Sequence, residues 1–334
     1  MISDAAYLTI LFEFLFFYLT LENLIQVKHL FVDVAPKNLN LIAMNMHKIS
    51  LLICSFLFLL TAHSATVAFA PQAKEKTTQT PTLKLPEAKP FSFNGYQGYT
   101  FTYNHVTCKI VQPNVTAKGI PWLIRARFWG HEPQLDCALL AHGFHIAYCD
   151  VADLYGSHEA VARWNALYQL LTKQGLNTKV ALEGMSRGGL IIYNWAAQNL
   201  DKVACIYADA PVMDITTWPL GTKGGKRSDR DAALLTKAYG YTTEAPLYQW
   251  KHNPIDHARE IAKANLPLLH VVGDADKTVP VASNTAVFAK RLATYGYTLQ
   301  IIHKPGIGHH PHSLKDPQPI LDFILKATKQ PSTF

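Results

Sequence analysis

The sequence is poor in charged residues and shows no repeat. Only 16% of its 334 residues are Asp, Glu, Lys or Arg, whereas 49% are apolar, and this balance excludes a disordered or coiled-coil chain. The net charge is +7, yet the Lys and Arg residues form no Arg-rich helix and no nucleic-acid motif. Without an internal repeat, a repeat architecture is excluded as well. What remains is an apolar chain long enough for one large domain or two small ones, with no nucleic-acid partner expected.

Cysteine is scarce, with five residues in the whole chain. Cys54 lies in a segment that we expect to be removed, which leaves Cys108, Cys137, Cys149 and Cys205. An even number of cysteines in an exported protein permits disulfides. Cys149 and Cys205 belong to apolar, strand-like runs, where a buried free thiol is common. The pairing of these cysteines stays open.

The N-terminal region contains a secretory signal pattern. A short basic segment starts at Met46, residues 49–60 are apolar, and Ala62-His63-Ser64 is a small-x-small cleavage site. We therefore expect a signal peptide at residues 46–64. The protein should then be secreted or periplasmic, with no stable membrane partner after the signal peptide is cleaved.

The residues before this signal are interpreted as an extension upstream of the true start. Residues 1–45 contain a further apolar run, from Tyr7 to Tyr18, that lacks a basic flank. A membrane helix is the rival interpretation of this run, but Glu13 would cost a few kcal/mol at the middle of a bilayer. Residues 65–95 are rich in Pro, Lys and Thr and are expected to be a linker.

From residue 96 onward, short β-branched runs alternate with helical patterns. This alternation predicts an α/β fold at residues 96–330: a doubly wound, mostly parallel sheet covered on both faces, with its active site at the carboxyl ends of the strands. Residues 98–110 are expected to form an edge strand or a hairpin. The other expected strands lie at 122–128, 144–149, 179–183, 203–208, 266–272 and 297–303, and the expected helices at 134–141, 158–174, 187–199, 281–295 and 319–326.

One segment interrupts the alternation. Residues 214–259 lie between two expected strands and are too long for a simple crossover. They contain Trp218, a Gly- and Lys-rich stretch and an expected helix at 230–239. We interpret this insertion as a small cap over the site, with Trp218 as a candidate to line the substrate site.

The sequence Gly184-Met185-Ser186-Arg187-Gly188 matches the Gly-x-Ser-x-Gly pattern. It follows a β-rich run and precedes an apolar helix, which is the strand–turn–helix context of a nucleophile elbow. The glycines suit such a turn because side chains at those positions would collide with the strand and the helix. Ser186 is the candidate nucleophile, and an ordinary Gly-rich turn with a capping serine is the alternative.

A serine hydroxyl needs a base to take its proton. The candidates follow the last expected strand, in the segment Gly308-His309-His310-Pro311-His312. His309 comes directly after Gly308 and is the preferred base, with His310 and His312 as alternatives. No carboxylate or Cys stands near these histidines with ligand spacing, so we expect no metal and no cofactor.

The imidazole in turn needs a carboxylate to fix its tautomer. Asp274 and Asp276 follow the penultimate strand, and Asp276 precedes the Val-Pro that opens the next helix. Asp276 is the preferred acid, while Asp274 is expected to brace the turn. Asp209, after the strand at 203–208, is the outside alternative.

An oxyanion would be stabilised by two backbone N–H groups. One belongs to the residue after the nucleophile, Arg187, and the other should come from the loop after an earlier strand. Trp129 and Gly130 occupy that loop, and Gly130 would allow close approach. Trp129 is also a candidate to line the substrate site.

The order Ser186, Asp276, His309 resembles the α/β-hydrolase superfamily over residues 98–328. Within it, the stretch from Asp276 to Val279-Pro280 is similar to the acid loop of dienelactone hydrolases, acyl-ester hydrolases and prolyl-oligopeptidase-like domains. The resemblance implies a catalytic triad of Ser186, Asp276 and His309. The loop around Trp129 lacks the His-Gly-Gly run of many lipases and esterases, and the doubled His309-His310 leaves the base open by one residue.

The expected function is that of a secreted serine hydrolase that cleaves a carboxylic ester through an acyl-enzyme. Tryptophan on loops would suit an ester carried on a carbohydrate, whereas Trp122, Trp164 and Trp195 are interpreted as core residues. The alternatives are a serine peptidase related to prolyl oligopeptidases and a non-catalytic binding protein of the same fold.

Overall fold

The computed structural model of the protein describes residues 82–331. The upstream extension at residues 1–45 and the signal peptide at 46–64 lie outside the described residues, as does the first part of the predicted linker. Within residues 82–331, no helix combines the length and the hydropathy needed to cross a membrane.

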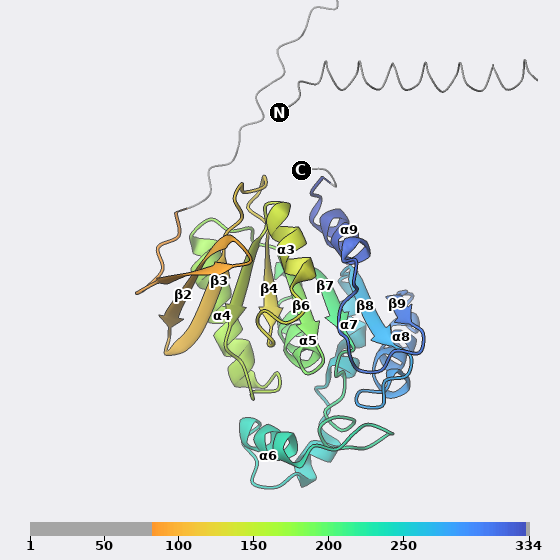
Figure 1. Ribbon diagram of the computed structural model, residues 1–334. Coiled ribbons are helices and arrows are strands. Elements are labelled where there is room, and N and C mark those ends of the chain that lie inside the picture. Colours follow the sequence, from red (N-terminus) through yellow and green to blue (C-terminus); the bar gives the residue numbers. More distant parts are fainter. Residues whose placement is uncertain (1–81, 332–334) are drawn as a thin grey trace, which may run out of the picture. The chain divides into compact units, whose positions relative to one another are not determined.

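Nine strands form a single sheet in the order β1-β2-β3-β5-β4-β6-β7-β8-β9 (Figure 1). The first three strands are antiparallel to their neighbours, whereas β5, β4, β6, β7, β8 and β9 run parallel to one another. This confirms the predicted doubly wound, mostly parallel sheet. The strands, in chain order, are β1 (Lys89–Phe93), β2 (Tyr96–Tyr103), β3 (Val106–Val111), β4 (Trp122–Ala126), β5 (His145–Cys149), β6 (Val180–Met185), β7 (Val203–Asp209), β8 (Leu268–Gly273) and β9 (Gln300–Lys304).

The prediction that residues 65–95 form a linker is wrong for their last part. Lys89–Phe93 form β1, which pairs with β2 at the edge of the sheet. Pro90 suits an edge strand, where a missing N–H costs no ladder hydrogen bond. Phe91 and Phe93 alternate with polar residues, and Phe93 is buried in the core. The Pro- and Lys-rich composition masked this two-residue period.

Helices cover both faces of the sheet (Figure 1). Helices α3 (Gln134–Ala141) and α9 (Gln318–Thr328) pack on one face. Helices α4 (His158–Lys173), α5 (Gly188–Gln198), α7 (Ala258–Lys263) and α8 (Thr285–Ala293) pack on the other. The central strands are buried on both faces because of this double cover, which explains their nearly continuous apolar sequences.

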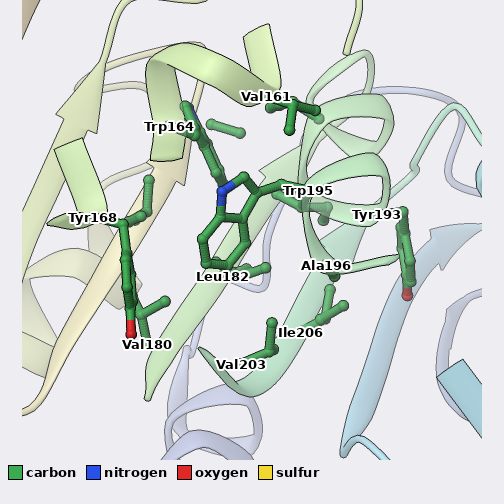
Figure 2. Close-up of a cluster of buried hydrophobic side chains, with 14 of the residues drawn as sticks. Val161, Trp164, Tyr168, Val180, Leu182, Tyr193, Trp195, Ala196, Val203 and Ile206 are labelled. Carbon is green, nitrogen blue, oxygen red and sulfur yellow. The ribbon is translucent and has the colours of Figure 1, made fainter. Parts of the chain in front are cut away.

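Aromatic side chains fill the core between α4, α5 and the sheet (Figure 2). The Trp195 ring centroid lies 6.1 Å from that of Trp164 and 5.7 Å from that of Tyr168. Trp122, Trp164 and Trp195 are all fully buried, which confirms their interpretation as core residues. The thiols of Cys108, Cys137, Cys149 and Cys205 are all free.

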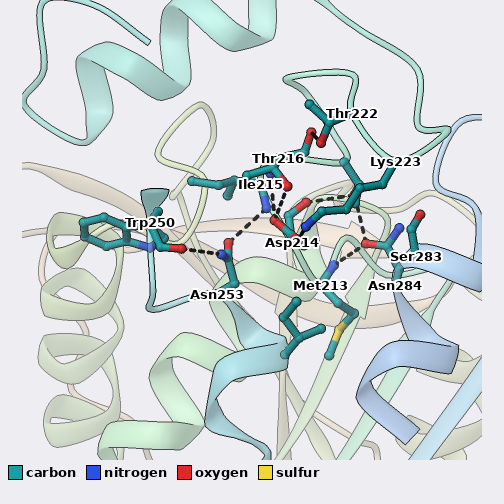
Figure 3. Close-up of polar contacts among 12 residues, drawn as sticks. Met213, Asp214, Ile215, Thr216, Thr222, Lys223, Trp250, Asn253, Ser283 and Asn284 are labelled. Atoms are coloured by element: carbon teal, nitrogen blue, oxygen red, sulfur yellow. Dashed lines mark hydrogen bonds and ion pairs between the residues drawn. The ribbon is translucent and has the colours of Figure 1, made fainter. Parts of the chain in front are cut away.

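The predicted insertion lies between β7 and β8 and carries α6 (Asp229–Ala238), with the short helices η2 (Ala245–Gln249) and η3 (Pro254–His257). Polar contacts join the start of the insertion to the core and to the end of the insertion (Figure 3). The Met213 N–H donates to Asn284 Oδ1 over 2.9 Å, and the Ile215 N–H donates to Asn253 Oδ1 over 3.0 Å. The insertion therefore starts from a fixed base just after the carboxyl end of β7.

Candidate active site

Ser186 stands on a tight turn between β6 and α5. Its φ of +51° is in the left-handed region, which non-glycine residues rarely occupy. A Cβ added to Gly184 would lie 2.7 Å from the Gly188 carbonyl oxygen, and one added to Gly189 would lie 2.6 Å from Pro211 Cβ. Glycine is thus required at Gly184, as the Gly-x-Ser-x-Gly pattern predicts, and also at Gly189, while a Cβ on the pattern's second glycine, Gly188, would lie 3.1 Å from the Ala126 carbonyl oxygen.

The structure brings Ser186, His309 and Asp276 together. Ser186 Oγ lies 2.9 Å from His309 Nε2, and His309 Nδ1 lies 2.7 Å from Asp276 Oδ2. Because a carboxylate only accepts hydrogen bonds, Nδ1 carries the proton, and Nε2 is left to accept the serine hydroxyl proton. The other oxygen of Asp276 accepts the backbone N–H groups of Thr278 (2.8 Å) and Val279 (2.9 Å), which fixes the carboxylate.

The loops that carry Asp276 and His309 are packed backbone against backbone. A Cβ at Gly273 would lie 2.2 Å from the Gly308 carbonyl oxygen and 2.5 Å from that of Ile307. The Ala275 N–H also donates to the Ile307 carbonyl over 2.8 Å. A side chain at position 273 would force the two loops apart and separate the carboxylate from the imidazole.

Two of the alternative residues lie further towards solvent. His310 is exposed, and its ring centroid lies 5.0 Å from that of His309. Partial burial, together with the neighbouring imidazoles of His312, His309 and His131, lowers the pKa of His310 below its usual value. Asp274 contacts His303 instead of His309: its Oδ1 lies 2.6 Å from His303 Nδ1, and both side chains are well exposed.

Asp209, the third alternative, faces His312. Its Oδ1 lies 2.6 Å from His312 Nδ1, and its Oδ2 accepts the Ser313 N–H over 2.9 Å. Both side chains of this pair are at least 98% buried. The Asp209 backbone carbonyl also accepts the Ser186 N–H over 2.8 Å. Asp209 thus stabilises both the elbow and the loop that carries the histidines. In the sequence, only its position at the end of an expected strand indicated a role near the site.

Trp129 and Gly130 occupy a tight turn after β4 in which the His131 N–H donates to the Phe128 carbonyl over 3.0 Å. The Trp129 ring packs 5.1 Å from Phe93 and 5.5 Å from Tyr148, measured between centroids, so these aromatic contacts account for its position. Gly130 is exposed, and a Cβ added there would meet nothing within 4 Å. Its φ of +76° explains the glycine, and close approach of a substrate to Gly130 stays a prediction.

Sequence reasoning missed Arg127 and Phe128, the residues between β4 and this turn. Both have positive φ, +60° and +46°. They lie next to the elbow: a Cβ added to Gly188 would lie 3.1 Å from the carbonyl oxygen of Ala126, the last residue of β4. The Arg187 guanidinium carbon lies 5.9 Å from the Phe128 ring centroid. The predicted strand extended to residue 128, so these two positions were counted as sheet.

A buried ionic cluster holds the loop after β4. Arg125 Nη1 lies 2.5 Å from Asp136 Oδ2 and 3.2 Å from Glu183 Oε1, and all three side chains are at most 1% exposed. Its Nη2 donates to the carbonyls of Phe128 and His131. Burial raises the pKa of Asp136 and of Glu183. Burial would lower the pKa of Arg125, but the two carboxylates outweigh it and raise the pKa.

Arg187 links the elbow to the cap. Its Nη1 lies 2.8 Å from Asp231 Oδ1 on α6, and its guanidinium carbon lies 5.0 Å from the Trp218 ring centroid. Tyr155 donates to the same Asp231 oxygen over 2.7 Å. Trp218 is only 7% exposed, so the ring expected to line the substrate site packs on Arg187 and Tyr155.

Three histidines after β9 come together beside the triad. One ring nitrogen from each of His309, His310 and His312 lies within 4.8 Å of the others. The expectation of no metal rested on the lack of a carboxylate nearby in sequence. The fold supplies one from a distant strand, since Asp209 at the end of β7 contacts His312.

Comparison with known proteins places this geometry in a family context. Residues 155–331 match the model of the prolyl oligopeptidase family. Among solved structures, Est1E from Butyrivibrio proteoclasticus is similar, with a TM-score of 0.50 and 17% identity over 73% of this chain and 99% of that one. An acylaminoacyl peptidase from Pyrococcus horikoshii has a TM-score of 0.51 and 15% identity over 75% of this chain, which spans only 44% of that protein. No curated protein sequence gives a significant match.

Proposed function

Since the chain belongs to the prolyl oligopeptidase family and is a serine hydrolase, we propose that it cleaves a carboxylic ester through an acyl-enzyme formed on Ser186. One observation carries the proposal. A hydroxyl, an imidazole and a carboxylate from three separate loops form a continuous chain of hydrogen bonds of 2.9 and 2.7 Å. Such an arrangement activates a serine that would otherwise be a poor nucleophile.

Each member of the triad has one role in the proposed reaction. Ser186 Oγ attacks the ester carbonyl while His309 Nε2 takes its proton, and Asp276 stabilises the imidazolium that forms. The proton then passes from His309 to the departing alcohol. In the second half-reaction, His309 takes a proton from water, and the resulting attack releases the acid and restores Ser186.

The developing oxyanion needs donors close to the elbow. The backbone N–H of Arg187 is one donor in the proposed mechanism, because Arg187 is the N-cap residue of α5, the helix that follows Ser186. The loop after β4 supplies the other, and the contacts of Arg125 with the Phe128 and His131 carbonyls support a fixed loop there. Loss of one such donor typically lowers kcat by about 10²–10³-fold.

The positions of two tryptophans bear on the identity of the ester. An ester on a carbohydrate was expected from Trp129 and Trp218, but both rings are engaged in packing. Export from the cytoplasm is also part of the proposal, resting on the signal pattern at residues 46–64. N-terminal sequencing of the purified protein should give a start near Ala65, whereas retention of residues 1–43 would contradict export by that signal.

Active-site labelling tests the proposed nucleophile. A fluorophosphonate probe should label the wild-type chain on Ser186 and should leave Ser186→Ala unlabelled. Ser92→Ala, which removes an exposed serine on β1, is the matched control and should label like the wild type. Equal labelling of Ser186→Ala and wild type would rule out Ser186 as nucleophile, and no labelling of any form would favour a non-catalytic binding protein.

Peptide hydrolysis is the second candidate, favoured by the family match over residues 155–331. A panel of p-nitrophenyl esters, acetylated sugars and aminoacyl amides separates the two activities. The ester proposal expects a higher kcat/KM on at least one ester than on every amide. Preferential cleavage of the amides, abolished in Ser186→Ala, would replace the ester by a peptide while keeping the triad.

A further inference from the structure

Four imidazoles gather beside the proposed catalytic triad. The ring centroids of His309, His310 and His312 lie 4.7 to 5.0 Å from one another. The exposed His131, from the loop after β4, lies 6.1 Å from His312 and 6.4 Å from His310. A serine hydrolase needs only one imidazole, as the catalytic base, so the other three rings have no role in the proposed reaction.

The rings are already oriented by contacts on their far sides. His312 Nδ1 faces Asp209 at 2.6 Å and His309 Nδ1 faces Asp276 at 2.7 Å, which leaves the Nε2 atoms of both rings for other partners. The backbone of the loop is fixed as well, because the Lys304 ammonium donates to the Pro311 carbonyl over 2.7 Å and to the Ser313 carbonyl over 3.1 Å.

We propose that His309, His310 and His312 form a binding site for a divalent transition-metal ion such as Zn²⁺, and that the bound ion switches the hydrolase off. One ring nitrogen from each histidine lies within 4.8 Å of the others, so binding needs movements of the three side chains, the largest of them by the exposed His310, to reach the roughly 2.0–2.1 Å bonds that Zn²⁺ prefers. A carboxylate behind a ligating histidine, as Asp209 is behind His312, is the usual support of such sites.

A metal ion bound to His309 should inhibit hydrolysis, because His309 has a single free lone pair. This inhibition rests on the proposed function. Nε2 of His309 accepts the hydrogen bond from Ser186 Oγ at 2.9 Å. An ion on the same nitrogen replaces that hydrogen bond, and Ser186 then has no base. Magnesium and calcium prefer oxygen ligands, so they are expected to leave the site and the activity unaffected.

Hydrolysis in the presence of Zn²⁺ tests the switch, with the tag-free, full-length protein. Zn²⁺ should inhibit ester hydrolysis reversibly, EDTA should restore the rate, and Mg²⁺ should have no effect. In His310→Asn, each rate is compared with the zinc-free rate of the same variant, and the half-inhibiting Zn²⁺ concentration should rise at least about tenfold, as for loss of a metal-site group. His303→Asn, which removes a nearby histidine outside the cluster, should behave as the wild type does.

Metal binding itself is measured without reference to activity. Co²⁺ should give visible d–d absorption bands with the wild type and with His303→Asn, and Zn²⁺ should abolish those bands by displacing Co²⁺. The bands should be lost in His310→Asn. Failure of Co²⁺ and Zn²⁺ to bind, or equal binding by His310→Asn and wild type, would overturn the site, and binding without inhibition would overturn the switch.

The two proposals fail in different ways. If zinc-free protein neither hydrolyses esters or amides nor reacts with a fluorophosphonate, the proposed function is wrong, while histidine-dependent Co²⁺ binding would still establish the metal site. If the enzyme is active and labels on Ser186 but Zn²⁺ does not protect Ser186 from labelling, the hydrolase stands and the switch is wrong.

Discussion

Two aspartate–histidine pairs stand side by side in this protein, and they differ in what lies beyond the imidazole. Asp276 and His309 are 2.7 Å apart, and Asp209 and His312 are 2.6 Å apart, both through Nδ1 and both with little or no exposure. Beyond His309 lies the Ser186 hydroxyl at 2.9 Å, whereas the His312 ring faces other imidazoles. The distance between a carboxylate and an imidazole therefore does not identify a catalytic base. The catalytic base is identified by the group at its other ring nitrogen, which for His309 is the Ser186 hydroxyl.

Two further histidines extend the comparison. Asp274 and His303 are as close as the other pairs, at 2.6 Å, but both are exposed to solvent. His270 is fully buried and has only hydroxyl partners, Tyr193 at 2.6 Å and Thr285 at 2.9 Å. Burial without a carboxylate lowers the pKa of His270 to about 3. The four sites separate the effects of the carboxylate, of burial and of the nucleophile.

The largest effect is expected from Asp276→Asn. An asparagine amide favours the wrong tautomer of His309, so kcat should fall by about 10⁴-fold with the fold intact. Steady-state kinetics on a p-nitrophenyl ester measure this, with circular dichroism as the check on folding. A loss below about tenfold would mean that Asp276 does not orient the base.

Asp209→Asn should act on stability more than on catalysis. The substitution weakens charge-assisted hydrogen bonds to His312 and to the Ser313 N–H, and we expect the free energy of unfolding to fall by about 1.5–3 kcal/mol. Urea denaturation measures this change. The fall in kcat should be far smaller than in Asp276→Asn. Equal falls in kcat in the two variants would contradict the assignment of a catalytic role to the Asp276–His309 pair and a structural role to the Asp209–His312 pair.

His270 should make the protein sensitive to acid. Because its pKa is about 3 when folded and 6.5 when unfolded, the unfolded chain binds more protons below about pH 6.5. The resulting stability is present above pH 6.5 and is lost as the pH falls towards 3. His270 alone should lower the free energy of unfolding by about 2 kcal/mol between pH 7 and pH 5.

Urea denaturation of wild type and His270→Gln at both pH values checks this expectation. The wild type should lose more stability between pH 7 and pH 5 than the variant, whatever the absolute cost of the substitution. A second buried histidine, His145, has a pKa lowered to about 4 by burial, so the variant should keep part of the acid sensitivity. Identical pH dependence of the two proteins would contradict the assignment.

The smallest effect is expected from Asp274→Asn. Pairs exposed to solvent contribute little because water and salt screen them, so the free energy of unfolding should change by less than about 0.5 kcal/mol. The kcat should stay within about twofold of the wild type if Asp276 is the acid, a difference of about 0.4 kcal/mol in the barrier. A loss comparable to that in Asp276→Asn would exchange the roles of the two carboxylates.

The elements and the order of the site residues could be predicted because they depend on local signals. The elbow combines a β-rich run, a Gly-x-Ser-x-Gly turn and an apolar helix, and all three occur within about twenty residues. The alternation of strands and helices predicted the parallel sheet, and parallel sheets place the loops after their strands at one edge. That rule is why Asp276 and His309 were expected near Ser186.

The remaining features depend on contacts between distant residues. Arg125 looks like an anomaly within an apolar strand, and only the fold shows that Asp136 and Glu183 surround it. Trp129 was expected at the substrate because it follows a strand, but β1 and β5 provide the aromatic surface on which it packs. The partnership of Asp209 with His312 joins residues that are 103 positions apart.

The contact between Gly273 and Gly308 also bears on how this enzyme can be redesigned. The two loops are in backbone contact, so a loop taken alone from a relative would meet a surface shaped for a different neighbour. A library that varies the acid loop should therefore hold position 273 as glycine or vary positions 307 and 308 with it. In engineering, the two loops should therefore be exchanged together, as one unit.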